Sequence, residues 1–155
     1  MLHQNSKIVY AVHRAGYGKT VMNFLAALYI KQNDEHVLYL VKDEYLKAQA
    51  IKKAEQLKVS GFDILCYREF KSKVQINSVL ICDEYYDALN EARLGVDSDH
   101  QPNPIFEVGF DHRALLTTAT YQESFFKLLM ATFGSVVYFA GDDVPIDEKS
   151  EDPLY

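Results

Sequence analysis

The chain has 155 residues, a length that fits one compact domain and leaves little room for a second. Its net charge of −6 argues against a surface that binds nucleic acid throughout, because such domains are usually basic. Any contact with nucleic acid should therefore be local or shared with a partner. No apolar run approaches the ~18 residues of a membrane span, and residues 1–7 lack the apolar core of a signal peptide. We expect an intracellular protein, cytoplasmic or nuclear, without membrane contact.

The order of the expected elements indicates the fold class. Short apolar runs, typical of buried strands, alternate with segments whose apolar residues recur at helical spacing. In chain order, we expect strands at 8–12, 37–41, 62–66, 79–82, 115–118 and 136–140. Helices are expected from the glycines at 16–18 to Asn33, from Asp43 to Leu57, at 86–94 and at 123–132. Such alternation predicts an α/β domain with a mainly parallel, doubly wound sheet between two helical layers. We assign residues 1–143 to this domain and 144–155 to an acidic tail.

Two helices show an apolar face that should pack on the sheet. On the first helix the apolar positions are Val21, Phe24, Leu25, Leu28 and Ile30. On the second, which Asp43 can cap, they are Leu46, Ala50, Ile51, Ala54 and Leu57. The second helix also carries Lys47, Lys52, Lys53 and Lys58, which favour a solvated face over a contact with a phosphate backbone.

The remaining sequence features give simpler expectations. The two cysteines, Cys66 and Cys82, lie inside apolar runs and should be buried free thiols. The five histidines lack the spacing of metal ligands, so no zinc site is expected. Three tyrosines are expected at the surface: Tyr17, Tyr85 and Tyr86.

One glycine-rich segment has the features of a phosphate-binding loop. It lies directly between an expected strand and an expected helix, and it consists of Ala15, Gly16, Tyr17, Gly18, Lys19 and Thr20. Glycines let successive backbone N–H groups point at phosphate oxygens, and the following helix adds its positive dipole end. Lys19 should reach the β- and γ-phosphates of ATP, and the Thr20 hydroxyl should bind Mg²⁺. His13 stands where the full pattern has a further glycine, which leaves an ordinary strand–helix turn as the alternative.

Two adjacent carboxylates follow the apolar strand at 79–82. The end of a parallel strand would place Asp83 and Glu84 at the edge of the sheet where ligands bind in open α/β folds. Asp83 should help to hold Mg²⁺, and Glu84 should orient or deprotonate the attacking water. Acidic residues also end many strands at solvated turns, so the interpretation depends on the phosphate loop earlier in the chain.

Taken in order, these motifs resemble the first RecA-like domain of superfamily 2 helicases and translocases. The phosphate loop at 15–20 and Asp83-Glu84 are similar to the family's two main ATPase motifs. Thr118-Ala119-Thr120 is similar to the motif that couples hydrolysis to movement, which implies coupling roles for Thr118 and Thr120. The segments 37–49 and 66–70 lie where the family contacts nucleic acid. The resemblance also implies that the strand at 115–118 lies between the Asp83 strand and a central strand that leads to the phosphate loop.

The resemblance implies an ATP-binding domain that hydrolyses ATP as one half of a nucleic-acid motor acting on DNA or RNA. In the family, a second RecA-like domain or a partner subunit supplies the arginine finger and the rest of the nucleic-acid track. Intact Lys19, Thr20, Asp83 and Glu84 favour the ATP-hydrolysing function. The expected lack of the second domain in these 155 residues, and altered flanking residues such as Tyr85 after Glu84 and Tyr121 in place of the usual proline, favour an alternative. That alternative is a non-hydrolysing nucleotide-binding or scaffold subunit of a larger assembly. A small-molecule kinase is a third possibility, although no arginine-rich lid segment is present.

Overall fold

The computed structural model describes residues 8–13, 18–32, 35–75, 78–94 and 112–140. The strands are β1 (Ile8–Val12), β2 (His36–Val41), β3 (Asp63–Cys66), β4 (Ser78–Asp83), β5 (Arg113–Thr118) and β6 (Val136–Ala140). The helices are α1 (Lys19–Lys31), α2 (Glu44–Leu57), α3 (Phe70–Lys73), α4 (Tyr85–Leu94) and α5 (Glu123–Phe133), with a 3-10 turn η2 (Tyr67–Glu69) before α3. Every strand and helix expected from the sequence is present, with shifts of one or two residues at the ends.

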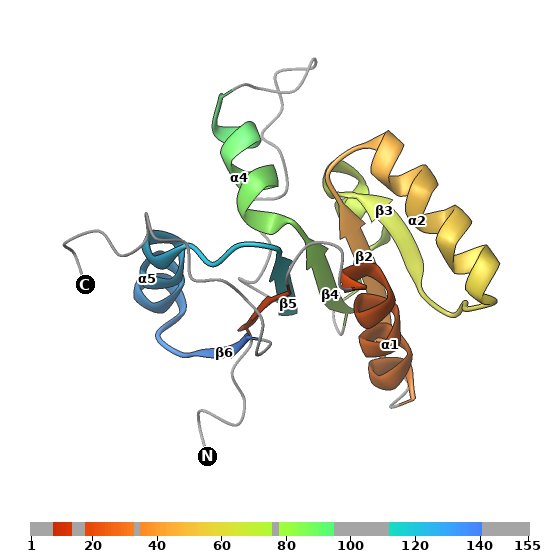
Figure 1. Ribbon diagram of the computed structural model, residues 1–155, viewed down its shortest axis with the longest axis horizontal. Helices are drawn as coiled ribbons and strands as arrows, with labels where there is room; N and C mark the ends of the chain where they lie inside the picture. Colours follow the sequence, from red (N-terminus) through yellow and green to blue (C-terminus); the bar gives the residue numbers. More distant parts are fainter. Residues whose placement is uncertain (1–7, 14–17, 33–34, 76–77, 95–111, 141–155) are drawn as a thin grey trace.

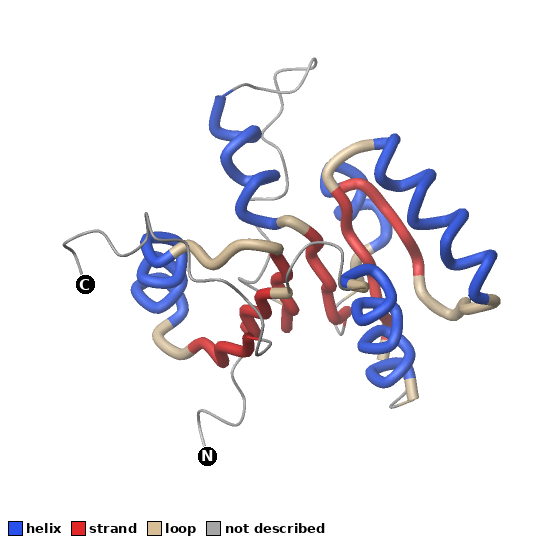
Figure 2. Tube along the Cα trace, in the orientation of Figure 1, coloured by secondary structure: helices blue, strands red, loops and turns tan. Residues whose placement is uncertain are grey.

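The six strands form a single parallel sheet in the order β3-β2-β4-β5-β1-β6. Helices cover both faces, as Figure 1 shows, with α1 and α2 on one side and α4 and α5 on the other. Figure 2 shows the same alternation of strand and helix along the trace. The α/β class with a parallel sheet between two helical layers is therefore confirmed.

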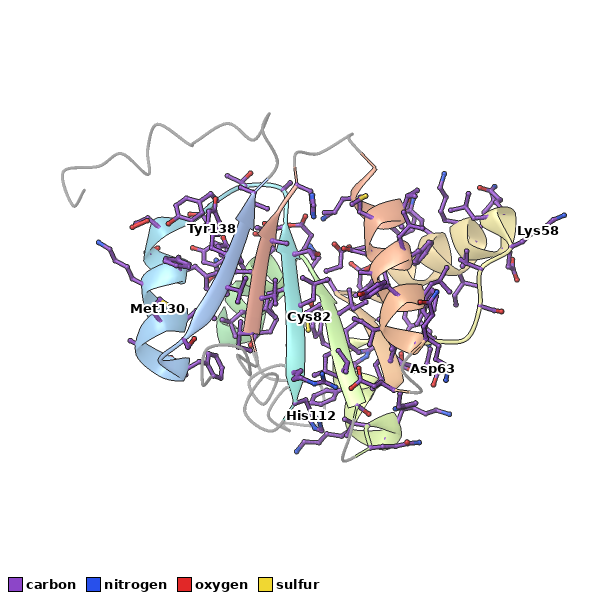
Figure 3. All side chains as sticks on the ribbon, turned by 90° about the horizontal axis from the view of Figure 1, so that it is seen from below. Lys58, Asp63, Cys82, His112, Met130 and Tyr138 are labelled. Atoms are coloured by element: carbon purple, nitrogen blue, oxygen red, sulfur yellow. The ribbon has the colours of Figure 1, made fainter. Side chains whose placement is uncertain are left out.

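Each face of the sheet has its own core. The larger one contains Tyr10 and Leu116 from the sheet with Phe125 and Leu129 from α5. The smaller one contains Phe24 and Ala27 from α1, Ala50 and Ala54 from α2, and Tyr39, among others, from the sheet. Because successive residues of a strand point to opposite faces and both faces are covered, the middle strands β4 and β5 are mainly apolar, with the polar Thr117 and Thr118 near the end of β5. Figure 3 labels Cys82, which lies within the sheet; both cysteines are buried and free, as expected.

Strand β5 lies between β4 and β1, as the resemblance implies. The expectation that the strand leading to the phosphate loop is central was wrong, because β1 is next to the edge strand β6. The loop therefore begins near one side of the sheet. β1 itself pairs with β5, which in turn pairs with β4.

Some side chains lie on a different face from the one that the helical pattern predicts. Leu25 of α1 is 55% exposed, while the polar Asn23 is 1% exposed, because the helix packs through Asn23, Phe24 and Ala27. On α2 the small residues Ala50 and Ala54 face the sheet, which leaves Ile51 38% and Leu57 42% exposed. Apolar periodicity predicted that each helix is present, but it did not predict the rotation of the helix about its own axis.

Tyr85 was expected at the surface, and this expectation was wrong. Its ring is buried 6.0 Å from the ring centroids of both Tyr67 and Phe125, so it fills the core between η2, α4 and α5. Tyr86 is partly buried against Phe125, and Tyr17 lies outside the described residues. Within the part of the chain that the structure describes, no helix has the length and apolar character needed to cross a membrane.

Candidate nucleotide site

The carboxyl ends of three neighbouring strands converge on one point of the sheet edge. In the parallel register, Val12 of β1 pairs with Thr118 of β5, and Thr117 of β5 pairs with Asp83 of β4. The backbone N–H of His13 then donates to the carbonyl oxygen of Thr118 at 2.8 Å, which extends the ladder one residue beyond β1. The glycine loop, the acidic pair and the Thr-Ala-Thr segment therefore begin side by side, as expected at this edge of an open α/β sheet.

Gly18 is the residue that turns the chain into α1. It is the N-cap of that helix and has a φ of 77°, in the left-handed region that side chains with a Cβ rarely adopt. Its carbonyl oxygen accepts the first helical hydrogen bond, from the N–H of Met22 at 2.9 Å. Lys19 and Thr20 are thereby placed on the first turn of α1. Three members of the expected loop, Ala15, Gly16 and Tyr17, lie outside the described residues.

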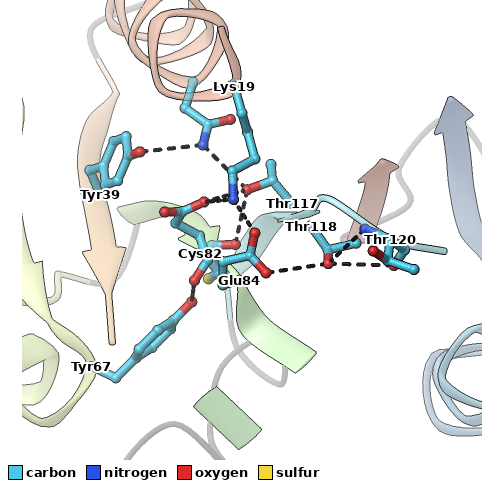
Figure 4. A network of polar contacts seen from close by, with 10 residues as sticks. Lys19, Tyr39, Tyr67, Cys82, Glu84, Thr117, Thr118 and Thr120 are labelled. Carbon is cyan, nitrogen blue, oxygen red and sulfur yellow. Dashed lines mark hydrogen bonds and ion pairs between the residues drawn. The ribbon is translucent and has the colours of Figure 1, made fainter. Parts of the chain in front are cut away.

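Lys19 meets both carboxylates of the acidic pair (Figure 4). Its Nζ lies 2.9 Å from Oδ1 of Asp83 and also pairs with Oε1 of Glu84. Burial acts to lower the pKa of the lysine, but the two carboxylates outweigh it, and the net effect raises the pKa of Lys19. The ammonium therefore stays charged, and one negative charge of the carboxylate pair is left over.

The backbone of Glu84 holds its side chain in this position. Glu84 has a φ of 51°, which is unfavourable for a residue with a Cβ. Its N–H donates to the carbonyl oxygen of Thr117 at 2.8 Å, and its carbonyl oxygen accepts from the N–H of Ala88 at 3.0 Å in α4. A strained conformation of this kind persists only where the surroundings fix it, and such residues are concentrated at functional sites.

The Thr-Ala-Thr segment contacts the acidic pair directly. Oγ1 of Thr118 makes a long hydrogen bond of 3.5 Å to Oε2 of Glu84. The same oxygen accepts from the N–H of Thr120 at 3.4 Å, and so the turn after β5 is tied to Glu84 through one hydroxyl. The structure thus brings Lys19, Asp83, Glu84 and Thr118 together, with Thr120 next to Thr118.

This set of contacts agrees with a comparison against known families. The family model described as Type III restriction enzyme, res subunit matches residues 1–103, which include the glycine loop and the acidic pair. The chain belongs to this family. A comparison with curated individual proteins finds no match.

As a member of the Type III restriction enzyme res subunit family, the chain is a helicase-like nucleotide-binding domain of the P-loop type. The resemblance to a RecA-like domain of superfamily 2 is thereby confirmed, together with the parallel sheet that such a domain has. Members of such helicase-like domains generally use ATP and Mg²⁺.

The oxygen atoms near Thr20 suit a magnesium ion. Thr20 and Asp83 line one pocket of about 230 Å³, together with Tyr39 and residues of α2. Hydroxyl and carboxylate oxygens are hard ligands of the type that Mg²⁺ prefers, and the ion usually keeps several waters, for which an open pocket leaves room. Thr20 and Asp83 are therefore the described residues of this pocket that could hold such an ion, and Lys19 balances part of the carboxylate charge.

His13 occupies the place of a pattern glycine without adding charge to the site. Burial and the nearby ammonium of Lys19 both lower the pKa of His13, so its imidazole stays neutral at pH 7. An uncharged ring next to the loop does not compete with Lys19 for anionic groups.

Three polar residues of the site were not identified from the sequence. Asn23, Tyr39 and Thr117 are each 1% exposed, and all three lie behind Asp83 on different elements. The available signals were an asparagine within the helical core pattern and a threonine inside an apolar strand. A polar residue at a core position usually has a hydrogen-bonding partner, but the sequence does not say which one.

Other candidate residues lie on α2, where Gln49 and Lys53 line the pocket with Thr20 and Asp83, and after β3. Lys47 pairs with Glu69 at 2.9 Å, while Lys52, Lys53 and Lys58 are exposed, in agreement with a solvated face. In the segment 66–70, Tyr67 and Phe70 are buried, so of these residues Arg68 has the most exposed side chain. Among the described side chains of histidine, cysteine and acidic residues, one group of Glu44, Cys66 and Glu69 lies close enough to suggest a metal. Its carboxylates already bond to Arg68, Lys47 and the Cys66 backbone.

Proposed function

We propose that this domain binds ATP with Mg²⁺ and hydrolyses it slowly, as one half of a helicase-like or translocase-like motor. The observation that carries the proposal is the contact of Lys19 with both Asp83 and Glu84 at the end of β4. An ordinary glycine turn does not require a lysine to contact two carboxylates at the end of a strand that is distant in the sequence. A phosphate loop does require this contact, because its lysine must lie next to the carboxylates that bind Mg²⁺ and orient the attacking water.

Each described residue has a role that its position supports. Backbone N–H groups at Gly18 and the first turn of α1 face the phosphates, with Ala15, Gly16 and Tyr17 as the preceding part of the loop. Lys19 reaches the β- and γ-phosphates, and Thr20 and Asp83 hold Mg²⁺. The bound ion supplies neutralisation of the charge that develops on the phosphate oxygens.

Glu84 orients and deprotonates the water that attacks the γ-phosphate. A general base must lie within hydrogen-bond reach of the proton that it takes, and Glu84 stands at the same sheet edge as Lys19. When the water attacks, its oxygen bonds to the γ-phosphorus, the bond to the ADP oxygen breaks and Glu84 receives the proton. Thr118 contacts Glu84 and is tied to Thr120, so this segment would move with the state of the carboxylate.

The partner of the motor would be a second RecA-like domain or subunit, with DNA or RNA as the track. Two described arginines are poorly placed to serve as an arginine finger. Arg113 is the first residue of β5, so it lies at the end of the strands opposite to the site, and it pairs with Glu35. Arg68 pairs with Glu44 at 3.6 Å. The expected contacts with nucleic acid would come from exposed side chains such as Gln49, which lines one pocket with Thr20 and Asp83, and Arg68 in the turn after β3.

A second candidate function is a non-hydrolysing nucleotide-binding or scaffold subunit. It is favoured by Tyr121, which takes the place of a proline after Thr120. Its ring contacts Tyr138 at 5.3 Å and Tyr10 at 6.1 Å, and its hydroxyl bonds to Glu123. An aromatic cluster of this kind would fix a segment that a motor has to move. The two functions differ in turnover and agree in nucleotide binding.

Calorimetric titration with ATP in the presence and absence of Mg²⁺ tests the proposal. Unchanged protein should bind, and Lys19→Ala should weaken the binding at least about a hundredfold, because a buried charge-assisted contact to phosphate is lost. Lys47→Ala is the matched control, since Lys47 also pairs with a glutamate, Glu69, but lies on α2. Equal affinity of the unchanged protein and Lys19→Ala would contradict the assignment of the loop.

A further inference from the structure

A buried chain of polar side chains lies behind the two residues expected to hold Mg²⁺. Oγ1 of Thr117 lies 3.3 Å from Oδ1 of Asp83, and Nδ2 of Asn23 lies 3.2 Å from Oγ1 of Thr117. The same Nδ2 lies 3.3 Å from the hydroxyl of Tyr39 (Figure 4). Tyr39 lines one pocket with Thr20 and Asp83. Burial raises the pKa of Tyr39, and a hydrogen bond with the Thr20 side chain acts against this larger effect. The path runs from Asp83 through Thr117, Asn23 and Tyr39 to Thr20.

The donors and acceptors of this path are matched. An asparagine NH₂ has two protons, enough to donate to both Tyr39 and Thr117. Because Asn23 donates to the Thr117 oxygen, the single proton of the Thr117 hydroxyl is directed away from it. That proton can be donated to Oδ1 of Asp83 or to the carbonyl oxygen of Cys82, which lie 3.3 and 3.4 Å from Oγ1 of Thr117. A negatively charged carboxylate is the stronger acceptor of the two.

Burial makes the path rigid and costly to break. Asn23, Tyr39 and Thr117 are each 1% exposed, and a buried polar group that loses its partner is destabilised by the full desolvation cost. The three residues come from α1, β2 and β5, so the path joins three elements at the point where Asp83 leaves β4. From the other side, the hydroxyl of Tyr67 donates to the backbone carbonyl of Asp83 at 2.8 Å.

We propose that Asn23, Thr117 and Tyr39 are positioning residues that orient Asp83 and Thr20 together for Mg²⁺. This inference rests on the proposed function and names the residues that set its metal affinity. Mg²⁺ demands nearly ideal octahedral geometry, so an error in the direction of either ligand weakens binding steeply. A hydrogen-bonded path between the two ligands fixes their directions relative to each other before the ion arrives.

Four variants test the path. Thr117→Val removes the hydroxyl and keeps the shape, whereas Thr117→Ser keeps the hydroxyl. Tyr39→Phe removes only the hydroxyl at the other end of the path. Thr132→Val is the matched control, the same change at an exposed position of α5.

The measurement is the binding of a fluorescent ATP analogue as a function of Mg²⁺ concentration, repeated with EDTA. Paramagnetic resonance of Mn²⁺ in place of Mg²⁺ reports the cation directly. Thr117→Val should raise the Mg²⁺ midpoint about tenfold, since a charged ligand loses one hydrogen bond. Tyr39→Phe should raise it about threefold, and Thr117→Ser and Thr132→Val should stay within about twofold of the unchanged protein. Nucleotide affinity in EDTA should be the same for all of them.

The outcomes separate this inference from the function on which it rests. Absence of Mg²⁺-dependent binding in the unchanged protein overturns the proposed function and this inference with it. Normal binding there, with equal Mg²⁺ midpoints for Thr117→Val and Thr117→Ser, overturns the positioning path alone. If Thr117→Val weakens nucleotide binding equally in EDTA and in Mg²⁺, the positioning path is also overturned, because a general packing defect would lower the nucleotide affinity in both conditions. If circular dichroism shows that Thr117→Val does not fold, the comparison of Tyr39→Phe with the unchanged protein decides in the same way.

Discussion

The ammonium of Lys19 lies 2.9 Å from Oδ1 of Asp83, which joins the first residue of α1 to the last residue of β4. Because Glu84 binds the same ammonium, one cation holds two neighbouring carboxylates that would otherwise repel each other. The contact therefore links the position of the phosphate loop to the position of the acidic pair. A substitution in the phosphate loop should therefore shift the acidic pair, and a substitution in the acidic pair should shift the loop.

The backbone of Gly18 gives a first prediction about the loop. Gly18→Ala places a Cβ on a residue with a φ of 77°, which costs about 1–2 kcal/mol although the Cβ itself would meet no atom within 4 Å. Relief of this strain would shift the loop and the first turn of α1. We expect ATP affinity to fall about tenfold.

Gly134→Ala is the matched control for this change. Gly134 has a φ of 75°, also without a close neighbour for a Cβ, but it ends α5 on the other side of the sheet. Both variants should lose similar thermal stability, and only Gly18→Ala should lose affinity in a nucleotide titration. Equal affinities of the two variants would show that the Gly18 conformation does not serve the ligand.

A second prediction concerns the base. Glu84→Gln keeps the size of the side chain and removes its basicity, so ATP should still bind while single-turnover hydrolysis falls by roughly 10²–10⁴. Quenched reactions at saturating ATP would measure the rate, with calorimetry as the check on binding. Hydrolysis at the unchanged rate would show that Glu84 is not the water-activating residue.

A third prediction assigns a different role to the neighbouring carboxylate. Asp83→Ala should weaken the dependence of ATP binding on Mg²⁺, because one of the two expected protein ligands is removed. Titration of Mg²⁺ at constant ATP compares it with Glu84→Gln, which keeps both ligands. The same Mg²⁺ dependence in the two variants would contradict the division of roles.

Much of this site could be anticipated because parallel strands end at a common edge. The order of strand, glycine loop and helix placed Lys19 there, and an apolar strand that ends in Asp83-Glu84 placed the acidic pair there. Local pattern is sufficient for such features, since each depends on a few adjacent residues. The cap of α2 is of the same kind, with Asp43 accepting from the N–H of Leu46 at 2.9 Å.

What the sequence did not predict depends on how the elements pack. The rotation of α1 decides that Asn23 is buried and Leu25 exposed, and helical spacing allows both. Tyr85 follows the acidic pair and could have faced solvent, but the left-handed turn at Glu84 directs it into the core. The path from Asn23 to Thr117 joins residues that are distant in the chain, so the one-dimensional pattern holds no signal for it.

A fourth prediction concerns stability near the turn after β3. Oε1 of Glu69 accepts from the N–H of Cys66 at 2.9 Å and from Lys47, and these contacts lower the pKa of Glu69. A carboxyl whose pKa is lower in the folded state stabilises the fold above its unfolded pKa, and this contribution is lost as the pH falls through the folded value. Glu69→Gln should therefore cost about 1 kcal/mol or less at pH 7, since the side chain is 35% exposed.

The pH dependence distinguishes this effect from a packing defect. The difference in unfolding free energy between the unchanged protein and Glu69→Gln should shrink below about pH 4.5, the ordinary value for a glutamate. Urea unfolding at several pH values measures it, with the exposed Glu55→Gln of α2 as the control. A difference that stays constant down to pH 3 would show that charge is not the cause.

The last prediction is that this chain alone hydrolyses ATP slowly and binds nucleic acid weakly. The described residues that would hold the phosphates are assembled, but an arginine aimed at the γ-phosphate commonly contributes about 10³–10⁵ in rate. Arg113 pairs with Glu35 at the other end of the strands, and Arg68 pairs with Glu44 at 3.6 Å, so both interact with carboxylates outside the acidic pair. In the resembled superfamily, the arginine lies across a cleft on a second domain.

Nucleic acid should bind with strong salt dependence, because the net charge is −6 and the basic contacts are local. Steady-state ATPase of the purified monomer, with and without single- and double-stranded nucleic acid, makes the test, and Lys19→Ala sets the background. Fast turnover that nucleic acid stimulates in a verified monomer would show that the chain completes its own active site, and the proposal of half a motor would be wrong.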